Sequence, residues 1–200
     1  MKNSLVIVAF FILGVLFGRL EIIPLAVVDS NVGFYALCAL MFCVGLSLGN
    51  DVNTLKRFRR INPRFYLLPV ATIVGTLLGC ALISFLLPGR STADVLAVGS
   101  GFGYYSLSSI FITEYKGAEL GAIALLSNIS RELMALLLAP FLVRYFGKLA
   151  PIAVGGATTM DTTLPIIMMS SGKEFAVIAV FHGFILDLSV PLLVTLFCSF

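Results

Sequence analysis

Charged side chains are scarce in this sequence of 200 residues. Only 12% of the residues are charged, whereas 60% are hydrophobic, and the mean hydropathy is +1.08. A soluble domain of this size needs a polar surface, so the composition excludes one. No long polar segment lies between the apolar runs, which also excludes an additional soluble catalytic domain.

Further absences narrow the class of membrane protein. The alternating ten-residue segments of a transmembrane β-barrel are missing, whereas several apolar runs are long enough for spanning helices. There is no two-histidine metal motif and no spaced nucleophile–base pair, so we expect neither an enzyme nor a metal or cofactor site. No small-residue cleavage site closely follows the first apolar run, so we interpret that run as a retained helix.

The cysteines lack both metal-ligand spacing and a disulfide pattern. All lie in apolar runs, where a thiol behaves as a small buried apolar side chain. The four positions are Cys38, Cys43, Cys80 and Cys198.

The hydrophobic runs predict an all-α polytopic membrane protein with a single transmembrane domain over residues 1–200. We expect a first span over 5–20 and four long transmembrane helices over 32–48, 65–87, 118–147 and 174–197. Two Gly-interrupted segments, 95–113 and 150–172, are expected to be broken or re-entrant. Gly75 and Gly79 form a small-residue packing motif in the third span.

Basic residues predict the orientation in the membrane. The short segment 51–64 is strongly basic and is expected to stay in the cytoplasm, so we predict no nucleic-acid partner. The N-terminus then lies inside and the C-terminus outside. Re-entrant interrupted segments would put nine basic residues inside and three outside, whereas crossing segments would give eight and four. This rule leaves both arrangements open. The basic residues of the segment are Lys56, Arg57, Arg59, Arg60 and Arg64.

An acidic group lies in the middle of the apolar segment 117–148. Glu132 has about two to three helical turns of apolar sequence on either side. Such a group is costly unless it is paired, neutralised or wet, and it usually lines a substrate or ion path. Asn128 shares its helix face, and Arg131 points to a neighbouring face. Glu132 is therefore a candidate proton- or cation-exchanging carboxylate, and a structural ion pair that locks two helices is the alternative.

The first interrupted segment has three glycines within five residues, which should break a helix. A broken helix offers free N–H groups at a half-helix start, where carboxylates and other anions bind. Neighbouring hydroxyl groups would add neutral hydrogen bonds. A nucleotide loop is excluded because no strand precedes the glycines, and tight packing alone is the alternative. The candidate residues are Gly101, Gly103, Tyr105, Ser106 and Ser108.

The second interrupted segment repeats this pattern. A glycine pair opens it, Asp161 follows among four threonines, and Pro165 closes it and leaves an upstream carbonyl free. These oxygens indicate a cation site, whereas an N-cap for a half-helix near Thr162 is the alternative. Two interrupted segments around one span are typical of transporter repeats, so an inverted repeat is suggested. The candidate residues are Gly155, Gly156, Thr158, Thr159 and Asp161.

The last span contains His182 and Asp187. His182, the single histidine, could relay protons, because its unperturbed pKa is near 6.5, or it could be a satisfied helix contact. Asp187 lies about 140° around the helix from it, so we expect the two not to face one site. Asp187 could pair with Arg131 or lie toward the far end of the span.

Four motifs together resemble the bacterial lysine exporter family of the LysO type. They are GFGYYSLSS at 101–109, SNISREL at 127–133, GATTMDTTLP at 156–165 and HGFIL at 182–186. The resemblance covers nearly the whole chain and implies export of L-lysine and its analogue thialysine across the inner membrane. The resemblance also implies that an acidic residue within the membrane is required, and the matching position in the SNISREL motif is Glu132.

Members of that family have about a hundred further N-terminal residues, which supply a second intramembrane acid. We therefore expect either a small membrane partner that supplies those spans or a homo-oligomer with Asp161 or Asp187 as the second acid. The resulting hypothesis is a multi-pass lysine/proton antiporter, with Na⁺ as another possible coupling ion. Glu132 would hold a proton or an ammonium group, and the half-helix starts near Gly103 and Gly156 would hold the carboxylate. A monovalent cation/proton antiporter and a non-transporting structural subunit are the alternatives.

Overall fold

The computed structural model describes residues 63–200 continuously and, before them, Leu16, Phe17, Arg19, Leu20, Tyr35, Ala39 and Phe42. The chain divides into two compact units, Met1–Asn50 and Asp51–Phe200, and the second carries every element named below. The predicted spans over 5–20 and 32–48, Cys38, Cys43 and most of the basic segment 51–64 lie outside the described residues. These expectations, and that of a single domain, stay predictions.

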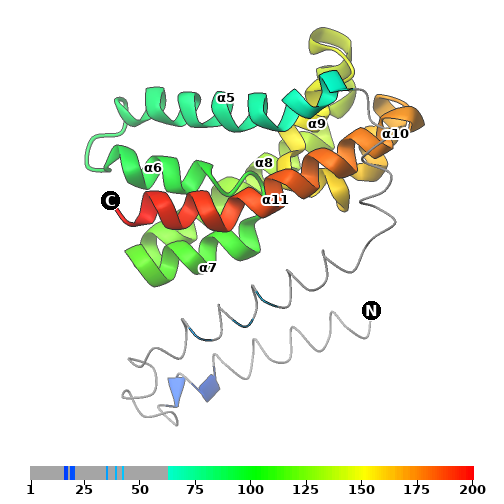
Figure 1. Ribbon diagram of the computed structural model, residues 1–200. Coiled ribbons are helices and arrows are strands. Elements are labelled where there is room, and N and C mark those ends of the chain that lie inside the picture. The colour runs from blue at the N-terminus through cyan, green and yellow to red at the C-terminus, as the bar shows by residue number, and fades with distance from the viewer. Residues whose placement is uncertain (1–15, 18, 21–34, 36–38, 40–41, 43–62) are drawn as a thin grey trace. The chain divides into compact units, whose positions relative to one another are not determined.

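Three long apolar helices dominate residues 63–200 (Figure 1). They are α5 (Leu67–Ser84), α8 (Ala118–Phe146) and α11 (Ala176–Cys198), and the short 3₁₀ helices η1 (Pro63–Tyr66) and η3 (Lys173–Phe175) precede the first and the last. With these extensions each is long and apolar enough to cross a membrane. At 1.5 Å per residue, α8 is about 43 Å long, which exceeds the roughly 30 Å hydrocarbon core of a bilayer. The predicted all-α class is confirmed for this part of the chain.

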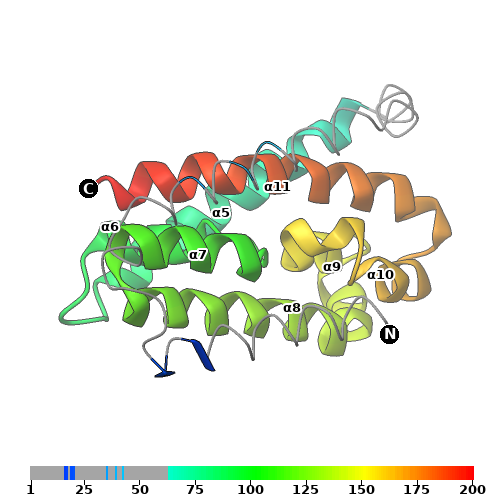
Figure 2. The same cartoon turned by 90° about the horizontal axis from the view of Figure 1, so that it is seen from below.

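Shorter helices fill the two segments between the long ones. The first segment consists of α6 (Thr92–Gly99) and α7 (Tyr105–Lys116), and the second of α9 (Ala150–Gly155), η2 (Gly156–Met160) and α10 (Leu164–Ser170). Figure 2 shows α6 and α7 beside one half of α8, and α9 and α10 beside the other half. The short helices of the two segments are separated at residues 100–104 and 161–163.

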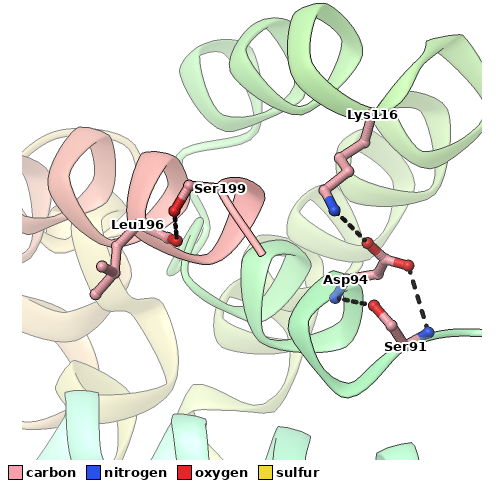
Figure 3. A network of polar contacts seen from close by, with 5 residues as sticks. All are labelled: Ser91, Asp94, Lys116, Leu196 and Ser199. Atoms are coloured by element: carbon pink, nitrogen blue, oxygen red, sulfur yellow. Dashed lines mark hydrogen bonds and ion pairs between the residues drawn. The ribbon is translucent and has the colours of Figure 1, made fainter.

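The two ends of the first segment, the start of α6 and the end of α7, lie side by side. Asp94 in the first turn of α6 lies 3.4 Å from the Lys116 ammonium at the last residue of α7. Ser91 completes this corner as the N-cap of α6, because its hydroxyl accepts the Asp94 N–H at 3.1 Å and its own N–H donates to the Asp94 carboxylate at 3.3 Å (Figure 3). This reciprocal pair is a capping box, which satisfies two helix-terminal donors.

The second segment also returns to its starting point. Lys148 just before α9 and Glu174 just after α10 form an ion pair of 3.5 Å. Figures 1 and 2 place the two starting points at opposite ends of α8. Each segment is therefore a hairpin, and the two hairpins approach one another from opposite ends of the bundle.

Helix α11 is the most enclosed of the long helices. Of its most apolar window 44% of residues are buried, compared with 17% for α5 and 22% for α8. It packs on α5, α6, α7 and η2, so elements far apart in the sequence meet along it. A small apolar cluster of Ile152, Ile167 and Ala179 joins it to α9 and α10. Polar side chains on α11 are consequently held inside the protein.

Two local expectations were wrong. Pro165 lies in the first turn of α10 rather than at the end of a motif, where its missing N–H has no intrahelical acceptor in any case. A half-helix does begin near Thr162, since Thr163 is the N-cap residue of α10. In the described part, a Cβ at Gly75 or Gly79 would meet nothing within 4 Å, so these glycines mark no close helix contact there.

Candidate functional site

The first hairpin turns at Phe102 and Gly103. Both residues have positive φ angles, 45° and 92°, which interrupt the right-handed helix between Gly99 and Tyr105. Glycine adopts this conformation without a steric penalty, whereas phenylalanine is held in it by its surroundings. Phe102 is fully buried. The turn therefore lies inside the protein, where its backbone groups need partners.

Asn128 of α8 supplies several of these partners. Its side-chain oxygen accepts the Gly103 N–H at 2.8 Å, and its amide nitrogen donates to the carbonyls of Val98 at 3.2 Å and Ala124 at 2.9 Å. A Cβ at Gly101 would lie 2.5 Å from the Asn128 amide nitrogen, so only glycine leaves room for this contact. Asn128, Gly101 and Gly103 lie together, and the polar groups of Asn128 and Gly103 bind one another.

The second hairpin meets the first at its own turn. The Ala157 N–H donates to the Phe102 carbonyl at 2.9 Å, which is a backbone hydrogen bond from turn to turn. Gly156 has a φ of 66°, and a Cβ there would lie 2.0 Å from the Phe102 oxygen. Gly155 is close by, because a Cβ at Gly103 would lie 3.2 Å from its carbonyl. The four glycines predicted for the site thus lie at one junction.

Arg131 holds the end of α9 against this junction. Its guanidinium donates to the carbonyls of Val154 at 2.9 Å and Ala153 at 3.1 Å, and to the Thr76 hydroxyl at 3.3 Å. A cation at a helix C-terminus is favoured, because free carbonyls gather there. The guanidinium also lies 5.8 Å from the centre of the Phe102 ring. No ion pair joins Arg131 to Asp187 among residues 63–200.

A polar cavity of about 80 Å³ lies beside the two turns. Its lining comes from the start of α7, from η2 and from α11. Asp187 is 5% exposed, and its Oδ1 atom has no hydrogen-bond partner among the described residues. Asp161 is exposed, and its Oδ1 atom accepts the Thr162 N–H at 2.6 Å. The lining residues are Tyr104, Ala157, Thr158, Met160, Asp161 and Asp187.

Glu132 lies at the midpoint of α8 and is half-buried. No hydrogen bond or ion pair within residues 63–200 involves its carboxylate. It does not line the polar cavity. The structure therefore places it apart from Asp161 and Asp187, without a described counter-charge.

The predicted hydroxyl groups mostly bind nearby carbonyls. Ser108 donates to Tyr104, Thr158 donates to Gly155, and each of these distances is 2.8 Å. Thr159 lies 2.8 Å from the carbonyls of both Gly156 and Ala179, so it joins η2 to α11. Tyr105 is half-buried and Ser106 is exposed. Of the predicted hydroxyl residues, Thr158 lines the cavity.

His182 is fully buried and is engaged at both ring nitrogens. Its Nε2 atom lies 2.9 Å from the Thr72 hydroxyl, and its Nδ1 atom lies 3.4 Å from the Thr159 hydroxyl. These contacts join α5, η2 and α11 and favour the alternative of a satisfied helix contact. His182 and Asp187 contact different groups, in agreement with their angular separation.

A larger cavity of about 420 Å³ lies between α5, α6 and α8. Its walls are mostly apolar, and Arg90 and Asp94 lie at its edge. It contains neither interrupted turn, so its size does not make it the better site. Within the described residues no three His, Cys, Asp or Glu side chains are placed to hold a metal ion.

Four of the six residues that line the polar cavity were not among the site residues named from the sequence, and two of these four, Tyr104 and Asp187, have polar side chains. Tyr104 directly follows Gly103, the last glycine of the first interrupted segment, and this position in the sequence could have identified it as a site residue. Asp187 was considered only as an alternative second acid, and its intramembrane position was the signal for it.

Comparison with known proteins gives a consistent result. Residues 8–198 match the family described as lysine exporter LysO. The Lysine exporter LysO of Escherichia coli strain K12 is 39% identical over 165 residues, which cover 82% of this chain and 54% of that protein. A putative lysine exporter of Haemophilus influenzae is 37% identical over 166 residues, covering 83% and 84%. The chain thus spans about half the length of the Escherichia coli relative. No solved structure is significantly similar to it.

Proposed function

Because the chain belongs to the LysO lysine exporter family, a family of transporters rather than enzymes, we propose that it exports L-lysine and thialysine-like analogues across the inner membrane in exchange for protons. Lysine carries two ammonium groups and one carboxylate. A transport path for it needs acidic groups at membrane depth and donors for the carboxylate. The junction of the two hairpins, with acidic side chains near it, is the observation that carries this proposal.

We propose that α5, α8 and α11 cross the membrane and that the two hairpins are re-entrant. The Asp94–Lys116 and Lys148–Glu174 ion pairs support this, since each joins the two ends of one interrupted segment. With the N-terminus cytoplasmic, the first hairpin enters from outside and the second from inside, and the C-terminus lies outside. Irregular backbone at membrane depth is tolerated where it is buried in protein, and the buried turns meet this condition.

Glu132 is proposed as the coupling carboxylate. It lies halfway along a helix long enough to span the bilayer, and no described group neutralises it. A carboxylate at that depth needs a counter-charge, which a proton or a substrate ammonium group can each supply. Alternate binding of the two would couple lysine movement in one direction to proton movement in the other.

The substrate carboxylate is proposed to bind at the start of α7. The first N–H groups of an α-helix have no intrahelical acceptor and attract anions. The sequence predicted that the helix starts near Gly103 and Gly156 bind this carboxylate. The Gly103 N–H is already bonded to Asn128, and the Ala157 N–H to Phe102, so we propose only the start of α7 as its binding site. Only a 3₁₀ turn begins at Gly156, and the next α-helix begins at Leu164.

Lysine flux in proteoliposomes under an imposed pH gradient tests the function. We expect gradient-driven lysine movement by the chain and its loss in Glu132→Gln, which keeps the size of the side chain but removes the charge. Glu114→Gln is the matched control, because Glu114 is an exposed acid on α7 outside the junction. Wild-type flux in Glu132→Gln would exclude Glu132 from the coupling step.

The second candidate is a monovalent cation/proton antiporter. The small acidic cavity favours it, since about 80 Å³ suits a small cation. Competition separates the two functions: Na⁺ would inhibit flux through the second, whereas excess unlabelled lysine would inhibit the first. A partner protein or a second copy stays a prediction, which the same assay tests after co-reconstitution. If cells that lack this protein resist lysine as well as wild-type cells do, the alternative of a non-transporting structural subunit is favoured.

A further inference from the structure

Asp187 is a buried acid that the protein leaves partly unsatisfied. The residue is 5% exposed, and within the part of the chain that the structure describes its Oδ1 atom has no hydrogen-bond partner. Buried polar atoms almost always have a hydrogen-bond partner, and an unpaired buried charge is costly. The carboxylate lines the polar cavity, so a group inside this cavity could supply the missing contact.

The other walls of the cavity make it suitable for a cation. Asp161 provides a second carboxylate from η2, and Tyr104 and Thr158 provide hydroxyl-bearing side chains. Among the described residues, no basic side chain lines the cavity. The nearest buried bases are engaged elsewhere, since Arg131 binds the end of α9 and His182 binds Thr72 and Thr159.

The size of the cavity selects the kind of cation. About 80 Å³ corresponds to two or three water molecules at roughly 30 Å³ each. A primary ammonium group fits this space, and its three N–H donors match oxygens on several sides. A whole lysine molecule does not fit, so its remaining atoms would extend out of the cavity. Ca²⁺ and Mg²⁺ take six or more oxygen ligands, which is more than the two carboxylates and two hydroxyl groups of this cavity can supply without bidentate carboxylates or water.

We propose that this cavity binds one ammonium group of the transported substrate between Asp187 and Asp161. This rests on the proposed function and adds a second acidic group, separate from Glu132, within the same chain. The α7 start lies at the same place, because Tyr104 is both its N-cap and part of the cavity lining. One end of the substrate would therefore meet a carboxylate-binding and an ammonium-binding group together.

Ligand binding to the full chain in detergent tests the site. L-lysine and methylammonium are titrated calorimetrically into wild type, Asp187→Asn and the control Glu114→Gln. Asp187→Asn keeps the shape of the side chain, and we expect it to raise the Kd of both ligands roughly 10- to 100-fold. Glu114→Gln is expected to bind both as wild type does, since Glu114 is exposed and lies outside the cavity.

The possible outcomes separate the site from the function. Equal binding of lysine by Asp187→Asn and wild type overturns the site and leaves the function intact. If the wild type binds methylammonium but not lysine, and Asp187→Asn weakens the binding of methylammonium, the ammonium site is supported and lysine is contradicted as the substrate. A wild type that binds neither ligand overturns the site.

Should Asp187→Asn fail to elute as wild type in size-exclusion chromatography, Asp161→Asn and Tyr104→Phe test the same cavity from η2 and from the start of α7. Each is expected to weaken the binding of both ligands, and unchanged binding in both variants overturns the site.

Discussion

One amide side chain satisfies the backbone of two helices at the junction. The Asn128 side chain accepts a hydrogen bond from the Gly103 N–H in the first hairpin turn. It donates hydrogen bonds to a carbonyl of α6 and to a carbonyl of its own helix. An amide can do this because it carries an acceptor and two donors on adjacent atoms. The residue is 3% exposed, so water cannot replace these bonds without reorganisation.

Asn128→Ala should therefore destabilise the protein by about 1–3 kcal/mol, since it leaves buried backbone groups without partners. Thermal unfolding in detergent measures the loss. Ser130→Ala is the control, because Ser130 lies two residues away on the same helix and, among the described residues, its hydroxyl bonds only the Leu126 carbonyl of that helix. Equal melting temperatures for the two variants would contradict the role given to Asn128.

The residues of the site were partly predictable. The polar content of SNISREL indicated that Asn128 and Arg131 are important, because polar groups in an apolar helix need partners. Their partners are backbone atoms of α6, α7 and α9, and no side-chain pattern reveals which carbonyls a fold leaves free. Asp187 was underrated for the same reason, since its lack of a partner depends on the surroundings of α11.

At the scale of elements, the two hairpins contact each other through closely apposed backbone. Gly156→Ala should disturb this contact, because its Cβ would overlap the Phe102 carbonyl and its φ of 66° disfavours any side chain. We expect a lower melting temperature and reduced lysine flux. Gly75→Ala in α5 is the matched control, with nothing within 4 Å of its Cβ in the described part. A helical alanine is favoured over glycine by roughly 1 kcal/mol, so this control should not destabilise.

The mouth of the first hairpin should respond to acid. Partial burial of Asp94 acts to raise its pKa, but hydrogen bonds from Ser91 and the charge of Lys116 outweigh this, and the pKa lies below its ordinary value. A carboxyl with a lowered pKa stabilises the folded state above its unfolded pKa, about 3.9, and this contribution is lost as the pH falls through the folded value.

The free energy of unfolding of wild type should thus exceed that of Asp94→Asn at neutral pH, and the difference should shrink below about pH 4. Denaturant titrations in detergent at several pH values measure it. A difference that is constant down to the lowest pH at which the protein folds would show that the charge of Asp94 does not matter.

The elements themselves were largely predictable from the sequence. Apolar runs located the three long helices, because the length of an apolar run is a local property of the sequence. The role of Pro165 was misassigned, since a proline can end one helix or begin another, and only tertiary context decides between these.

At the scale of the whole described unit, a long helix followed by a returning hairpin occurs twice. Helix α5 precedes the hairpin of α6 and α7, and α8 precedes that of α9 and α10. Figures 1 and 2 show α5 and α8 running in opposite directions. This supports the suggested inverted repeat, although the two hairpins have little sequence in common beyond their glycines and hydroxyl residues.

This arrangement predicts the sidedness of labelling. Single cysteines at Thr92 and Tyr115, in a background with the four native cysteines changed to serine, should react with an impermeant thiol reagent from the outside. Cysteines at Lys148 and Glu174 should react from the cytoplasmic side. Reaction of positions 92 and 115 from opposite sides would show that the first segment crosses the membrane.

Sequence reasoning could not choose between crossing and re-entrant segments, because the two arrangements differ by one basic residue on each side of the membrane. The ion pairs that favour re-entry join residues more than twenty positions apart, such as Asp94 and Lys116. Such pairings depend on where each chain segment turns, which the periodicity of a sequence does not specify.

The turn-to-turn hydrogen bond between Ala157 and Phe102 has an electrical consequence. If the two hairpins are re-entrant, as proposed, and water reaches each turn from its own side, the membrane potential falls across the short distance between the turns rather than across the whole bilayer. A single charge that passes this point would then exchange about 2.3 kcal/mol with the field for every 100 mV. Export of a cation could in this way be driven or opposed by voltage at one narrow step.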